Sequence, residues 1–143
     1  MSRNWVFLFV LLPSLLSGCA AYRSYNRGET CDRSIREYSR LVRWSEMEKA
    51  VIAMVDQGQR DAYARTAESM RRRDVTMVDA RILAQECHAK QGRAEATMEF
   101  DYFVMPDNRL KTVTDHQQWV YREGSSDDQV PGWKLITPPP RFR

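Results

Sequence analysis

The sequence predicts an α+β domain in which three N-terminal helices pack on a four-stranded antiparallel meander sheet. Two observations carry this prediction. Apolar residues recur at helical spacing through the first half of the chain, up to about residue 72. After Asp74 they alternate with polar residues, which is the period of a half-buried strand.

The helical half divides into three segments. The first covers residues 30–43 and carries Tyr38 in its apolar stripe. The second begins at Ser45, which has the spacing of a capping box with Glu48, and it ends at Gly58. The third covers residues 60–72 and includes Tyr63. Each helix has one apolar face that needs a partner, so we expect the helices to cover one side of the sheet.

The sheet half contains four alternating runs. A two-residue turn at Gln91-Gly92 separates the first two runs, and a second turn signal lies at 106–108. The predicted strands are residues 75–90, 93–105, 110–121 and 132–137. Three prolines at 138–140 cannot continue a strand because they offer no N–H donors, so the chain should end in a proline-rich tail.

The turns also predict which side chains face the helices. Even-numbered positions of the second strand are apolar, and cross-strand partners share a face. This pairing places Leu83, Gln85 and Cys87 on the inner face, with Arg81 opposite Tyr102. In the third strand the inner face should carry Val113, Asp115, Gln117, Trp119 and Tyr121. The two histidines, His88 and His116, should face outward.

An apolar run over residues 5–16 follows the single positive charge of Arg3. It is too short to cross a hydrocarbon core of about 30 Å, and it has the form of a secretory signal. Leu16-Ser17-Gly18-Cys19 follows directly and resembles a bacterial lipobox. The resemblance implies a diacylglycerol group on the Cys19 thiol, cleavage before Cys19, and acylation of the new amino group, for example with palmitate.

The lipobox defines the expected organisation of the chain. Residues 1–18 should be a signal peptide, 19–29 a flexible tether, and 30–143 a single domain. The residue after the cysteine is Ala20, which in the lipoprotein family implies the inner leaflet of the outer membrane, facing the periplasm. We therefore expect a protein that is lipid-anchored in the bacterial cell envelope.

The charge of the mature chain excludes some partners. Removal of 18 of the 143 residues leaves 125, and the loss of Arg3 lowers the 22 basic residues to 21, against 19 acidic ones. This balance predicts no nucleic-acid partner and no electrostatic attraction to a membrane. Partners should instead be the membrane, through Cys19, and an envelope protein or a small apolar ligand.

If Cys19 is acylated, Cys31 and Cys87 are the two remaining thiols, and they lie in an oxidising compartment. They are either a disulfide or two unrelated apolar core residues, and the sequence leaves this open. No His or Cys pair has metal-ligand spacing, so we expect no metal and no cofactor.

Several stretches, among them "RLVRWSEMEKAV" and "KTVTDHQQWVY" followed by "GWKLITPPPRF", resemble the cone-shaped superfamily of ketosteroid isomerase and nuclear transport factor, including SnoaL-like proteins. The resemblance covers residues 30–142 and implies that the four-stranded antiparallel meander is curved and cone-like, with a pocket inside the cone. Polar or aromatic inward positions are the pocket candidates: Asp115, Gln117, Tyr102 and Trp119, with Tyr63 reaching in from the third helix.

Two functions of different class follow. The first is a non-catalytic lipoprotein whose domain binds a partner protein or a small apolar ligand. The alternative is a tethered isomerase- or hydrolase-like enzyme that uses Asp115 as a base and Tyr102 as a donor. A single carboxylate beside Gln117, without an inward histidine, matches a catalytic dyad poorly, and the first function is therefore preferred.

Overall fold

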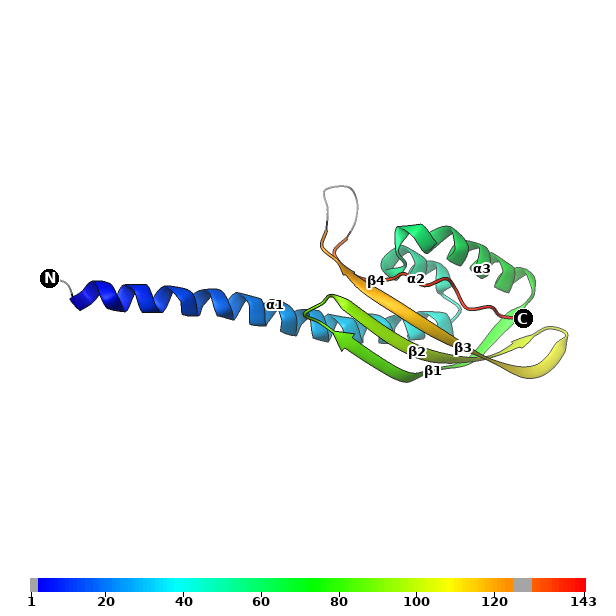
Figure 1. Cartoon of the computed structure of the whole chain (residues 1–143). Coiled ribbons are helices and arrows are strands. Elements are labelled where there is room, and N and C mark those ends of the chain that lie inside the picture. The colour runs from blue at the N-terminus through cyan, green and yellow to red at the C-terminus, as the bar shows by residue number, and fades with distance from the viewer. Residues whose placement is uncertain (1–2, 125–129) are drawn as a thin grey trace.

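The computed structural model describes residues 3–124 and 130–143, with side chains described at Cys19 and from Ala21 onward. Three helices pack on one face of a four-stranded antiparallel sheet, as the sequence predicts (Figure 1). The helices are α1 (Arg3–Arg43), α2 (Met47–Met54) and α3 (Arg60–Arg72), with a short 3-10 turn, η1 (Gln57–Gln59), before α3. The strands are β1 (Val75–His88), β2 (Arg93–Val104), β3 (Asp107–Arg122) and β4 (Gly132–Leu135).

The strands follow one another in the order β1-β2-β3-β4, so the sheet is the predicted meander. It is open, with β1 and β4 as its edge strands. The edge at β4 is partly continued by Val55, which forms a parallel bridge with Leu135. The core lies between the sheet and the helices, where α1 contributes Ile35 and Tyr38 and β2 contributes Phe100.

Helix α1 begins far before the predicted domain boundary. It is one continuous helix from Arg3 to Arg43, so the segment 19–29, expected to be a flexible tether, is helical. The segment lacks an apolar stripe, but Trp133 Nε1 donates to the Arg27 carbonyl oxygen at 2.9 Å. The Arg27 guanidinium also lies over the Tyr121 ring, 4.7 Å from its centroid. Contacts with β3 and β4 therefore fix a part of α1 that local sequence does not specify.

The boundaries of α2 differ from the prediction. Ser45 has a φ of 59° and lies between the helices, and Glu46 is the N-cap residue without a side-chain cap bond, so the predicted capping box is wrong. The helix ends before Val55, not at Gly58, because Val55 is extended beside β4 and the Asp56 N–H donates to Leu135 O at 2.9 Å. Pairing with the sheet overrides the local helix signal.

The inner and outer faces of β3 agree with the prediction and those of β1 agree only near the turn, although the residue pairs are shifted by two positions in both cases. Cys87 pairs with Ala94 as expected for the inner face, but register shifts interrupt β1 between Met77 and Asp79 and between Ile82 and Ala84. As a result, Leu83 is 54% exposed and was wrongly placed inside. The bulges could not be predicted because alternation alone assumes an uninterrupted strand.

Arg81 was also wrongly placed opposite Tyr102. It pairs with Glu99 in the ladder and forms ion pairs with three carboxylates. Arg81 Nη1 lies 2.9 Å from Asp79 Oδ2 and 2.6 Å from Asp101 Oδ2, and the other terminal nitrogen contacts Glu99. Glu99 and Asp101 belong to the outer face of the sheet, and Asp79 also lies 3.9 Å from Arg43 Nε at the end of α1. The turn before β2 also spans four residues, 89–92, and not two.

Candidate functional site

Three of the predicted pocket residues form a hydrogen-bonded row on the inner face of β3. Gln117 Nε2 donates to Asp115 Oδ2 at 2.7 Å, and Trp119 Nε1 donates to Gln117 Oε1 at 3.1 Å. All three side chains are buried. Along β3 every second side chain lies on the same face, so residues two positions apart in the sequence can form a continuous row of hydrogen bonds.

Two tyrosines from the helices complete this cluster. Tyr38 of α1 packs edge-to-face on Trp119, with ring centroids 5.8 Å apart, and on Tyr63 of α3, with centroids 6.5 Å apart. Both tyrosines are fully buried. Within the part of the chain that the structure describes, neither hydroxyl has a hydrogen-bond partner. The cluster thus combines a carboxyl, an amide, an indole and two phenols in a dry interior.

Burial sets the electrostatics of the cluster. Loss of solvent raises the pKa of Asp115, and the hydrogen bond from Gln117 only partly offsets this effect. Burial also raises the pKa of Tyr38 and Tyr63, and the nearby Asp115 carboxyl raises both further. Proton loss is therefore disfavoured at each of the three groups, which suits a neutral, hydrogen-bonded core more than a site that exchanges protons with a substrate.

A substrate would need a path to Asp115, and packing closes the space around it. Asp115, Gln117 and Trp119 are each at most 6% exposed, and both tyrosines are completely covered. Two surface cavities are lined by none of Asp115, Gln117, Tyr38 and Tyr63, although Trp119 borders the second. One of about 370 Å³ borders the end of α2, and another of about 380 Å³ lies on the sheet beside the β1–β2 turn. A general base that cannot meet a substrate cannot act on one.

Tyr102 does not belong to this cluster, which corrects the pairing of Tyr102 with Asp115. Its hydroxyl donates to Arg143 O at 3.1 Å and accepts from Arg143 N at 2.9 Å. Phe142 packs edge-to-face on the Tyr102 ring with centroids 5.1 Å apart. Asp115 faces Met98 in the ladder, four residues away along β2. Tyr102 therefore fastens the C-terminal tail to the sheet.

The cysteines have distinct environments. Cys31 of α1 and Cys87 of β1 are joined in a disulfide, with Cα atoms 6.4 Å apart. Cys31 is buried and Cys87 half-buried. Cys19 is a free, exposed cysteine on α1, three turns of helix before Cys31. The bridge ties α1 to the edge strand and leaves Cys19 as the accessible thiol of the described chain.

The histidines lie on the outside of the domain, as the register predicts. His116 is exposed and its Nδ1 lies 3.3 Å from Thr97 Oγ1, while His88 is exposed near Glu86. Among the described residues, no group of three or more His, Cys, Asp and Glu side chains is arranged to hold a metal ion.

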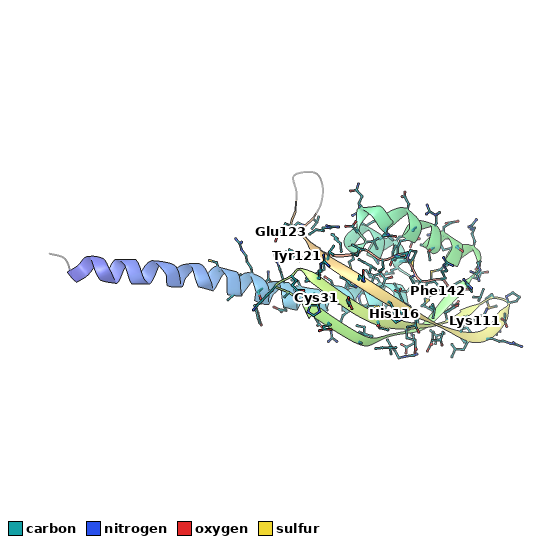
Figure 2. The ribbon with its side chains drawn as sticks, viewed as in Figure 1. Cys31, Lys111, His116, Tyr121, Glu123 and Phe142 are labelled. Carbon is teal, nitrogen blue, oxygen red and sulfur yellow. A yellow bond between two sulfur atoms is a disulfide. The ribbon has the colours of Figure 1, made fainter. Side chains whose placement is uncertain are left out.

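Sequence reasoning missed the contacts of Arg27. This residue lies in the segment taken as a tether, and it combines the π contact with Tyr121 and the hydrogen bond from Trp133 with an ion pair to Glu123. The available signal was the aromatic pair at Tyr121 and Trp133, at the ends of two neighbouring strands. Figure 2 shows Tyr121 and Glu123 at the end of the sheet from which α1 projects, and Lys111 at the opposite end.

Comparisons with known proteins bear on the fold alone. No family model matches the chain, and no curated protein does. Among solved structures, a SEC-C motif containing protein from Psychrobacter arcticus is similar over 82% of this chain at a TM-score of 0.57 and 10% identity, and this chain spans 64% of that one. The intermembrane space region of the chloroplast protein ARC6 is similar over 77% of this chain and 92% of that one, at 11% identity and a TM-score of 0.48. The ketosteroid isomerase resemblance stays a prediction.

Proposed function

We propose that this chain is an envelope lipoprotein, acylated at Cys19, whose α+β domain binds a partner protein or a small apolar ligand and does not catalyse a reaction. The observation that carries the proposal is that one cysteine is free and exposed and the other two form a disulfide. Cys19 directly follows the lipobox residues and is exposed and free, while Cys31 and Cys87 are joined. Disulfides persist in oxidising compartments, which agrees with export.

The acyl chains would supply the attachment to the membrane. Each buried CH₂ of a lipid chain contributes about 0.8 kcal/mol, so two or three chains on one cysteine anchor a protein stably. Among the helices whose residues are described, none combines the length and apolar character needed to cross a membrane. In this proposal the protein is located at the inner leaflet of the outer membrane and its domain faces the periplasm.

The preference for binding over catalysis rests on the interior. The enzyme hypothesis needed Asp115 and Tyr102 in one accessible pocket, and they occupy separate places, the first under the helices and the second under the C-terminal tail. The buried row from Asp115 to Trp119 supports the fold, because each of its three side chains is hydrogen-bonded to a neighbour in the row. A filled interior leaves the surface of the domain for partners.

The test of the anchor is Cys19→Ala, expressed with its native signal in a Gram-negative host. We expect an unprocessed precursor that takes up no labelled palmitate. The matched control is the double variant Cys31→Ala/Cys87→Ala, which keeps Cys19 and should be processed and labelled like the unaltered chain. Palmitate incorporation by the Cys19→Ala precursor would contradict the proposal. Once the anchor is established, crosslinking in the native envelope would identify the partner.

A further inference from the structure

A groove of about 540 Å³ lies directly beside the proposed attachment point. It is lined by Ala21, Arg23, Ser24 and Arg27 of α1 and by Lys90 of the β1–β2 turn. Cys19, Arg23 and Arg27 are spaced four residues apart and share one face of α1. Acyl chains on Cys19 would therefore leave the helix on the side that carries the two arginines.

Two of the three cations in this groove have no ion-pair partner in the described part of the chain. Arg27 contacts Glu123 and Tyr121, which accounts for its charge. Arg23 and Lys90 are exposed and form no ion pair within residues 3–124 and 130–143. The chain as a whole has nearly balanced charge, which argued against electrostatic attraction to a membrane, but two exposed cations without an ion pair among the described residues line this one groove.

Two tyrosines lie on the opposite side of the same turn of α1 from the groove, because successive residues are about 100° apart around a helix. Tyr22 and Tyr25 are three residues apart and each is 71% exposed, so their rings lie on one side of α1 without cover. A phenol has an apolar ring and a polar hydroxyl, and tyrosine is enriched where a membrane meets water for this reason. An exposed tyrosine pair beside unpaired cations is the composition of a membrane-interface segment.

Helix geometry places these residues at the depth of lipid headgroups. With a rise of about 1.5 Å per residue, Tyr22 and Arg23 lie about 4.5 and 6 Å along the axis from Cys19, and Arg27 about 12 Å. The polar layer of one leaflet is roughly 5–8 Å thick. A helix that starts at the hydrocarbon boundary therefore carries Tyr22 and Arg23 within this layer, Tyr25 to its outer edge at about 9 Å, and Arg27 just outside it.

We propose that this end of the molecule is a seat for anionic phospholipid headgroups of the leaflet in which Cys19 is anchored. Arg23 and Lys90 hold the headgroup phosphates in the groove, and Tyr22 and Tyr25 lie among the headgroups. The inference rests on the proposed lipid anchor and adds an orientation to it. The domain stands on the membrane with the β2–β3 hairpin directed away from it, because that hairpin lies at the opposite end of the molecule (Figure 1).

The test measures how far the hairpin stands from the membrane. Acylated full-length protein carrying Arg109→Cys is labelled with a donor dye. Residue 109 lies in the hairpin and is exposed, and the other three cysteines are acylated or bridged. Vesicles contain acceptor-labelled headgroups with either pure phosphatidylcholine or 30% phosphatidylglycerol. We expect the lowest energy transfer on the anionic vesicles, because the seated domain holds the dye away from the surface, and higher transfer on neutral vesicles.

Charge reversal supplies the second arm. Each basic residue near an anionic surface favours contact by about five-fold, from ~1 kcal/mol per residue, so Arg23→Glu/Lys90→Glu should reduce the preference for the seated orientation by at least about 25-fold. Energy transfer on anionic vesicles should then rise to its neutral-vesicle value. The matched control, Arg65→Glu/Arg141→Glu, reverses two exposed charges elsewhere and should leave the low transfer unchanged.

The outcomes separate the two proposals. A chain that is not acylated and does not float with vesicles would overturn both. A chain that floats but gives equal energy transfer on neutral and anionic vesicles would overturn the headgroup seat alone. Loss of the low transfer on addition of 10 mM inorganic phosphate at constant ionic strength would also overturn the seat, because it would show a site for soluble anions and not for the lipid surface.

Discussion

Reduction of the Cys31–Cys87 disulfide should lower the free energy of unfolding by about 4 kcal/mol. The two cysteines are 56 residues apart, and the bridge closes this loop in the unfolded chain as well as in the folded one. In the chain-entropy treatment, the loss of entropy is 2.1 cal/mol/K plus 1.5R times the logarithm of the loop length, which for this loop is about 14 cal/mol/K. At 25 °C this entropy corresponds to the stated 4 kcal/mol.

The assay is equilibrium urea unfolding of the acylated protein in detergent, with and without a phosphine reductant. Mass spectrometry of alkylated samples establishes whether the bond is intact in each. For a domain of this size the midpoint of thermal unfolding should also fall, by about 15 °C. The wild-type chain is its own best comparison, because reduction changes no side chain other than the two cysteines.

A matched pair of variants isolates the bridge from other effects of reductant. Cys31→Ala/Cys87→Ala should unfold near the midpoint of the reduced wild type and should not respond to reductant. Cys19→Ser keeps the bridge and should respond fully. The reasoning would be refuted if the reduced and oxidised wild type unfold at the same urea concentration while alkylation shows that the bond has been broken.

Other substitutions test the interior. Asp115→Asn should stabilise the protein at pH 7 and have little effect at pH 3, as measured from urea midpoints at both pH values. Burial raises the pKa of Asp115 in the folded state, so stability is lost as pH rises from the pKa of the unfolded state toward that of the folded state. Each pKa unit between the two states contributes about 1.4 kcal/mol. Tyr38→Phe removes a buried hydroxyl that has no hydrogen-bond partner among the described residues, and it should be neutral or stabilising by about 1 kcal/mol. Tyr102→Phe loses two hydrogen bonds to Arg143 and should destabilise the protein by about 1 kcal/mol in the same assay. Equal effects of the two substitutions would contradict both assignments. Phe142→Ala should cost about 3 kcal/mol and increase proteolysis of the C-terminal tail, because this ring is buried against Tyr102 and Phe100.

Periodicity predicted the fold wherever burial was local and regular. Third-strand alternation placed Asp115, Gln117 and Trp119 on the inner face, and the structure has them there. It failed at Leu83 because a bulge adds a residue on one strand without any mark in the sequence. Tyr102 lies on the predicted face, but its predicted neighbour was wrong: its hydroxyl contacts Arg143, at the far end of the chain. The period of the sequence determines which face of the sheet a side chain occupies, whereas its contacts depend on the tertiary structure.

The segment from Cys19 to Gly28 shows why the candidate surface could not be found from sequence. Its composition is that of a linker, and the residues that hold it, Tyr121 and Trp133, come from strands about a hundred positions away. In a helix, the spacing of four between Cys19, Arg23 and Arg27 places the proposed attachment point and the cations on one face. In a flexible chain the same spacing would not align them. The disulfide at Cys31 then ties the same helix to the sheet about 18 Å beyond Cys19. If Cys19 is anchored as proposed, a helix joined covalently to the domain would transmit the orientation of the anchor to the whole molecule, and headgroup contacts at one end would determine which face is available to a partner at the other.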